Sequence, residues 1–124
     1  MNQSYMINRD ADSFLEHSRQ IHSLAESLSQ DGIAIYEHSY SMLSFGSWFL
    51  ILGKRKYRVR FTWDGKDGIL KAEEALIPNS RTIIKWKEIA LDFDTKSVGD
   101  NIFKSIEDFI RKKFQAQPVN EGDG

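Results

Sequence analysis

Hydrophobic residues recur at helical spacing near the beginning of the chain. Ser13 and Glu16 have the three-residue separation of a capping box, which favours the start of a helix. Apolar side chains then follow every three or four residues up to Asp31 and Gly32, a pair typical of a helix end. The pattern predicts a helix over about residues 13–30, with His17 on its apolar stripe as a core or boundary residue.

A second helical pattern lies near the other end. Ser97 and Asp100 repeat the capping spacing, and apolar residues from Ile102 to Phe114 recur at helical intervals. This pattern predicts a helix over about residues 98–114. The remaining residues, 115–124, contain proline, glycine and acids without apolar anchors, so they are predicted to form a disordered tail.

Two strands in the middle of the chain show the clearest alternation. In Lys56–Trp63 every second residue is apolar and the residues between are basic or polar, as in a strand with one buried face. The preceding run, Trp48–Leu52, is apolar at every position, and Gly53–Arg55 fits a hairpin connection. Either a two-residue or a four-residue loop puts the same side chains on one face: Trp48, Leu50 and Leu52 with Tyr57, Val59 and Phe61.

Further strands complete a predicted sheet. Gly32–Ser39 and Ile69–Leu76 have strand character, and the Asp-Gly pairs between Asp64 and Gly68 indicate a turn. Another strand is expected over Arg81–Glu88, with a bulge or break near its end because Ile89, Leu91 and Phe93 alternate in the opposite phase. The expected fold class is α+β: an N-terminal helix, an antiparallel sheet of about five strands and a C-terminal helix, arranged as a two-layer sandwich.

Composition fits one domain, predicted over residues 1–114. The 124 residues are 40% hydrophobic and 28% charged, enough for a core without metals or disulfides. Cysteine is absent, which excludes a disulfide framework, a thiol nucleophile and a thiolate zinc site. Neither a signal peptide nor a long apolar span is visible, so a cytoplasmic location without membrane contact is expected.

Motifs for catalysis or cofactor binding are weak. Phe45-Gly46-Ser47-Trp48 lacks the second glycine of a nucleophile elbow, and no glycine-rich phosphate loop occurs. His17 and His22 are five residues apart, so a helix turns them away from each other. We therefore predict no catalytic residue, no metal ligand and no cofactor, and expect a protein that is more plausibly not an enzyme. The alternative is a metal-dependent hydrolase or nuclease using Asp64, Asp67 and Glu73, with Glu74 and Lys71 nearby.

Charge is distributed unevenly along the chain. Residues 53–87 contain ten Lys or Arg and four Asp or Glu, although the whole chain has a net charge of −1. If both helices cover one sheet face, the opposite face is expected to be basic and partly apolar. Cations that follow phosphates and an aromatic ring that stacks on bases would suit nucleic acid, which is a further alternative.

The leading interpretation is a non-enzymatic protein-interaction module. A strand that is apolar on both faces would leave Phe49 and Ile51 exposed in a two-layer domain, and exposed apolar surface usually marks an interface. The partner is expected to be a second copy of the chain, as a homodimer, or another protein bound in the manner of an adaptor, chaperone or inhibitor. The predicted interaction face contains Phe49, Ile51, Arg58, Arg60, Ile83, Lys85 and Lys87.

Overall fold

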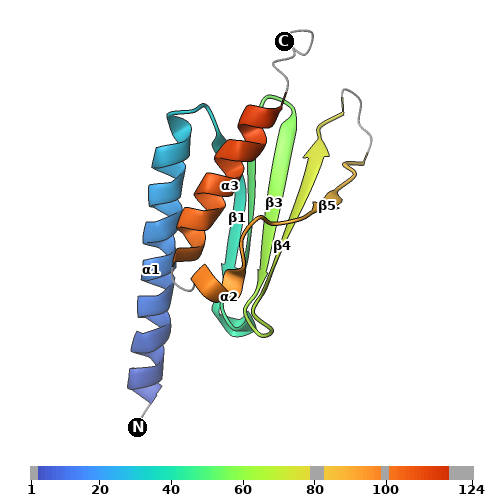
Figure 1. Cartoon of the computed structure of the whole chain (residues 1–124). Coiled ribbons are helices and arrows are strands. Elements are labelled where there is room, and N and C mark those ends of the chain that lie inside the picture. The colour runs from blue at the N-terminus through green and yellow to red at the C-terminus, as the bar shows by residue number, and fades with distance from the viewer. Residues whose placement is uncertain (1–2, 79–82, 99–100, 118–124) are drawn as a thin grey trace.

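The computed structural model describes residues 3–78, 83–98 and 101–117, and it confirms the α+β architecture. Two long helices lie on one face of a five-stranded antiparallel sheet (Figure 1). The sheet is a meander, because its strand order β1-β2-β3-β4-β5 follows the chain. No helix of the described segments lies over the opposite face, called here the outer face (Figure 1).

The first helix, α1, spans Gln3–Ser29 and begins about ten residues before the predicted start. Ser13 is therefore inside the helix and is not its N-cap, because no proline or glycine interrupts the preceding residues. The predicted C-terminal stop is confirmed. Gly32 has φ +75°, and the Ile33 amide donates back to the carbonyl oxygen of Leu28 at 3.1 Å, which closes the last turn.

The four long strands are β1 (Ala34–Ser41), β2 (Ser47–Lys54), β3 (Tyr57–Asp64) and β4 (Ile69–Leu76). A short 3-10 helix, η1 (Met42–Ser44), joins the first two. The β2–β3 hairpin has a two-residue loop, since Lys54 pairs with Tyr57. Leu50 pairs with Phe61, and Phe61 pairs with Ala72, so these three buried side chains share the face that packs on the helices.

The last strand, β5, spans only Lys87–Ile89, which is much shorter than the predicted Arg81–Glu88. Residues 83–86 have no regular secondary structure, and Arg81 lies outside the described residues. The predicted bulge or break near Glu88 is wrong, because Lys87, Glu88 and Ile89 pair with β4 in regular register; the strand ends after Ile89. Leu91 and Phe93 leave the strand pattern and pack against the core from an irregular segment that runs back toward the helices.

The C-terminal helical region is two helices: α2 (Thr95–Val98) and α3 (Ile102–Ala116). The single predicted helix over 98–114 therefore starts too early, and the second half of its proposed capping box, Asp100, lies outside the described residues. At its other end α3 continues two residues into the predicted tail. The rest of that tail, from residue 118, is outside the described residues.

A continuous core joins the two layers. Leu24 and Leu28 from α1 and Ile106, Phe109 and Ile110 from α3 pack against the inner side chains of the sheet. Full burial of such aliphatic and aromatic groups supplies most of the driving force for folding. Among the described helices, none is long and apolar enough to cross a membrane.

Candidate functional site

The outer face of the sheet has two arginines stacked on aromatic rings. The guanidinium carbon of Arg58 lies 3.8 Å from the centre of the Tyr36 ring, and that of Arg60 lies 4.3 Å from the centre of the Trp86 ring. Stacked geometry of this kind is favourable because the ring face carries partial negative charge. Arg60 pairs with Ile51, and Phe49 precedes Ile51 on the same face of β2; both apolar side chains are half-buried.

Gly53 makes the first stack geometrically feasible. A Cβ atom at this position would lie 2.5 Å from Cδ of Arg58 and 2.6 Å from its Nη1 atom, so the arginine occupies the space that a side chain would fill. Arg58 thereby crosses β2 and reaches Tyr36 on β1. Its Nη1 also donates to the carbonyl oxygens of Arg55 and Tyr57, at 2.7 and 3.1 Å.

A bulge in β1 places Tyr36 on this face. The pairing with β2 shifts between Ile35 and Glu37, so that Ile35 faces the core while Glu37 pairs with the outer-face residue Ile51. The extra residue, Tyr36, is exposed and lies beside the arginine. The irregularity therefore adds an aromatic ring that regular alternation would not have provided.

Arg60 is held by two partners. Its Nη2 lies 2.9 Å from a carboxylate oxygen of Glu73, and its Nε donates to the same oxygen at 3.0 Å. Both side chains of this pair are between a quarter and a third exposed, so water screens the pair only in part. These contacts hold the guanidinium in one orientation.

The structure divides the predicted interaction face. Phe49, Ile51, Arg58 and Arg60 lie together on the outer face, as their register positions require. The other three, Ile83, Lys85 and Lys87, line a pocket on the helix side of the sheet. Lys87 belongs to that side because it pairs with Glu74, which bonds to the inner residue Tyr57.

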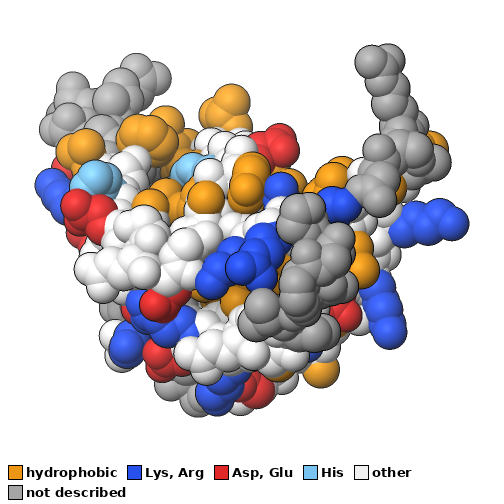
Figure 2. Space-filling view, turned by 90° about the horizontal axis from the view of Figure 1, so that it is seen from above, with side chains coloured by type: hydrophobic (Ala, Val, Ile, Leu, Met, Phe, Trp, Pro, Cys, Tyr) orange, Lys and Arg blue, Asp and Glu red, His pale blue; other side chains and the backbone are white. Residues whose placement is uncertain are grey.

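This division changes the charge of the outer face. The register of the described strands places three cations and four acids there: Arg58, Arg60, Lys71, Glu37, Asp64, Glu73 and Glu88. Figure 2 shows the upper end of the molecule, where acidic and basic side chains are also interspersed. The strongly basic face expected from the sequence is therefore a charge-balanced one.

The carboxylates of the predicted hydrolase site do not converge. Asp64 closes the predicted turn, where its side chain accepts from the amides of Lys66 and Asp67 at 3.0 and 3.2 Å. Glu73 lies on the outer face, whereas Glu74 lies on the inner face and accepts from the Tyr57 hydroxyl at 2.6 Å. Within the described part of the chain, no three His, Cys, Asp or Glu side chains gather as a metal site.

Two histidines meet in an aromatic cluster between α1 and β1. The Nε2 atoms of His17 and His38 are 2.8 Å apart, so one ring donates and the other accepts. Tyr40, Trp48 and Phe103 surround His17, which is only 6% exposed. Burial, followed by the proximity of His38, lowers the pKa of His17 to about 4, and burial also lowers the pKa of His38.

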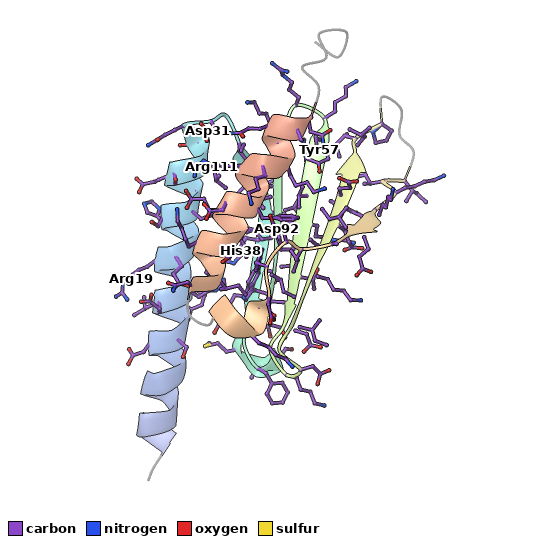
Figure 3. All side chains as sticks on the ribbon, viewed as in Figure 1. Arg19, Asp31, His38, Tyr57, Asp92 and Arg111 are labelled. Atoms are coloured by element: carbon purple, nitrogen blue, oxygen red, sulfur yellow. The ribbon has the colours of Figure 1, made fainter. Side chains whose placement is uncertain are left out.

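A charged cluster joins the upper ends of α1 and α3 (Figure 3). Arg111 donates to the Asp31 carboxylate at 2.8 Å, to the Ser27 carbonyl at 3.1 Å and to the Glu107 carboxylate. Burial alone would raise the pKa of Glu107, but hydrogen bonds from Ser27 and Arg111 outweigh that effect and lower it. The ionised cluster therefore stabilises the contact between α1 and α3.

A loop at the other end of the sheet exposes apolar side chains that sequence reasoning did not identify. Leu43 is 98% exposed, and Met42 and Phe45 are also exposed. Phe45 has φ +59°, an unfavourable backbone conformation for an aromatic residue. The run Ser41–Phe45 has no sequence pattern that marks these side chains as exposed. Their exposure follows from the short η1 turn, which only the structure shows.

Comparison of the chain with known protein families, with characterised proteins and with solved structures gives no match. The candidate site therefore rests on the geometry of this chain alone.

Proposed function

We propose that this chain is a non-enzymatic protein-binding module, that the outer face of the sheet is its interface, and that a second copy of the chain is its partner. The observation that carries the proposal is the pair of arginine–aromatic stacks on the same face as Phe49 and Ile51. Tyrosine, tryptophan and arginine are the residues most enriched among those that dominate binding energy at interfaces.

Preorganisation supports this function. Arg60 is fixed by Glu73 and Trp86, and Arg58 is fixed by Tyr36 and two backbone carbonyls. Side chains that are already ordered lose little conformational entropy when a partner covers them. The face is therefore a stiff surface with apolar residues at its centre and polar residues around them.

The balance of charge favours a second copy as the partner. A two-fold interface brings one surface against itself, so each cation of one copy needs an acid of the other. The outer face provides both signs. Among the described residues, Arg58 and Lys71 form no ion pair with an acid, and Glu37 and Glu88 lie on the edge strands β1 and β5. A basic face would instead repel its own copy.

The test is sedimentation velocity of the wild type and three variants over a concentration series. The wild type is expected to sediment faster as concentration rises. Ile51→Asp, which puts a charge in the centre of the face, and Arg58→Ala, which removes one stack, are expected to stay monomeric. Ser23→Asp adds the same charge on the exposed surface of α1 and is expected to behave as the wild type. Identical sedimentation of all four proteins would overturn the proposal.

A further inference from the structure

A pocket of about 870 Å³ lies between the end of α3, the end of β4 and the segment that leads into β5. It is on the helix side of the sheet, so it is separate from the outer face. Figure 1 shows the reason for the opening: α3 slants across β1 to β3 and leaves the ends of β4 and β5 uncovered. Its size is within the range of small-molecule sites.

The lining is largely aliphatic. Ile83 and Leu76 line the pocket and remain 87% and 67% exposed, respectively. Pro78 lies beside them. Apolar area of this extent is unfavourable in water, and an apolar ligand that covered it would gain from its removal from solvent.

Polar groups of the pocket carry more positive than negative charge. Lys85 and Lys87 both line it, and neither forms an ion pair with an acid of the described segments. Among the described lining residues the one carboxylate is that of Glu74, which accepts a hydrogen bond from the Tyr57 hydroxyl at 2.6 Å. Burial, followed by contact with Glu74, raises the pKa of Tyr57, so the hydroxyl stays protonated and continues to donate to that carboxylate.

Tyr57 also has a fixed orientation. Its ring meets the Phe114 ring edge-on with centres 5.0 Å apart, and Figure 3 places it under the end of α3. The Tyr57–Glu74 pair therefore forms a preformed polar wall, and Lys87 is the cross-strand neighbour of Glu74 on the same face. Since neither Lys85 nor Lys87 forms an ion pair with a described acid, both are available to an anion. An anionic group near the lysines and an aliphatic group against Ile83 and Leu76 would satisfy both parts of the lining.

We infer that this pocket binds an amphipathic anion, a small molecule with an aliphatic chain and a terminal carboxylate. The ammonium groups of Lys85 and Lys87 hold the carboxylate, and the chain covers the exposed aliphatic wall. The inference does not depend on the proposed dimer, because none of these residues lies on the outer face.

The test is a calorimetric and NMR titration of the full chain with octanoate, with octanol and acetate as probes that keep only one half of the ligand. Octanoate is expected to bind saturably, and octanol and acetate at least about tenfold more weakly. Octanoate is expected to shift the resonances of Tyr57 and Ile83. Equal affinity for octanoate and octanol would overturn the role of the lysines, and the absence of saturable octanoate binding would overturn the site.

Variants separate this site from a general effect of charge. The double variant Lys85→Gln/Lys87→Gln is expected to bind octanoate about tenfold more weakly, and Leu76→Ser is expected to weaken it as well. Lys66→Gln removes an exposed cation from the distant turn and is the matched control, with unchanged affinity expected. Ile51→Asp should also leave octanoate binding unchanged, and a loss in either control would contradict the assignment.

Discussion

At the scale of single residues, the position of Arg58 on the outer face depends on the lack of a side chain at Gly53. Gly53 does not have a positive φ, so its backbone is one that any residue adopts. What requires glycine is the arginine that lies across it. Since the obstructing atoms belong to the flexible end of Arg58, a methyl group would displace the arginine without disturbing the sheet.

Gly53→Ala therefore separates binding from stability. Alanine restricts the unfolded chain, so the free energy of unfolding is expected to change by no more than about 1 kcal/mol in urea denaturation. Self-association is expected to weaken, because Arg58 leaves the Tyr36 ring. The NMR signals of the Tyr36 ring are expected to shift in Gly53→Ala as they do in Arg58→Ala, because both changes remove the guanidinium from the ring. Weaker association with unchanged Tyr36 signals would show that the glycine acts by another route.

The His17–His38 pair makes stability depend on pH. In the folded chain the pKa of His17 is about 4, against 6.5 for an ordinary histidine. Between these values the unfolded state binds more protons than the folded state, so stability is greatest above about pH 6.5 and decreases as pH falls toward 4. The size of this effect is on the order of 3–4 kcal/mol, because the two pKa values differ by about 2.5 and each unit corresponds to about 1.4 kcal/mol.

His17→Phe retains a buried ring without a titratable group. The free energy of unfolding of each protein is measured in urea at pH 7 and at pH 4.5. Between these two pH values it is expected to decrease less in His17→Phe than in the wild type. The matched control is His22→Gln, since His22 is exposed and only makes a 3.5 Å contact with Glu26. The control should lose as much stability as the wild type. Parallel losses in His17→Phe and the wild type would contradict the role of the histidine pair.

The outer-face residues on β2 and β3 were predictable, but their aromatic partners were not. Phe49, Ile51, Arg58 and Arg60 follow from strand periodicity, which fixes the face of each side chain. Tyr36 reaches the face through a bulge, and Trp86 reaches it from a segment without regular structure. The position of both depends on tertiary contacts that no local pattern records.

At the scale of elements, Arg111 connects α1 to α3. Truncation of Arg111 would leave the Glu107 carboxylate, 17% exposed, with the Ser27 hydroxyl as its remaining hydrogen-bond donor among the described residues. Uncompensated charge in such a position is costly. Arg111→Ala is therefore expected to lower the free energy of unfolding by about 2–3 kcal/mol.

The control for this change is Arg19→Ala, which removes an exposed ion pair with Glu16 within α1. Exposed pairs contribute little, so the expected loss in urea denaturation is below about 1 kcal/mol. Equal losses in the two variants would mean that the cluster between the helices has no more effect on stability than a surface pair.

The accuracy of element prediction followed the strength of each local signal. The β4 bounds, Ile69–Leu76, were predicted to the residue because turn signals frame the strand. The start of α1 was wrong because the capping-box spacing also occurs inside helices. The strand before Ile89 was too long because residues 83–86 have β-type side chains, whereas the chain leaves the sheet there to border the pocket.

At the scale of the whole molecule, the basic residues of segment 53–87 lie on two different surfaces. The meander sends Arg58 and Arg60 to the outer face and Lys85 and Lys87 to the pocket on the helix side. A local charge excess in sequence therefore does not become one basic face. Each surface instead has its own balance: matched charges on the outer face, and an excess of cations in the pocket.

The most direct test of the account is the solution mass of the unmodified chain by light scattering, from about 1 µM to about 1 mM, a range that includes weak and moderate dimer affinities. The account predicts a weight-average mass that rises from 14.4 kDa toward twice that value as the concentration increases. A mass that stays at 14.4 kDa over the whole range would contradict the assignment of the outer face as an interface between two copies.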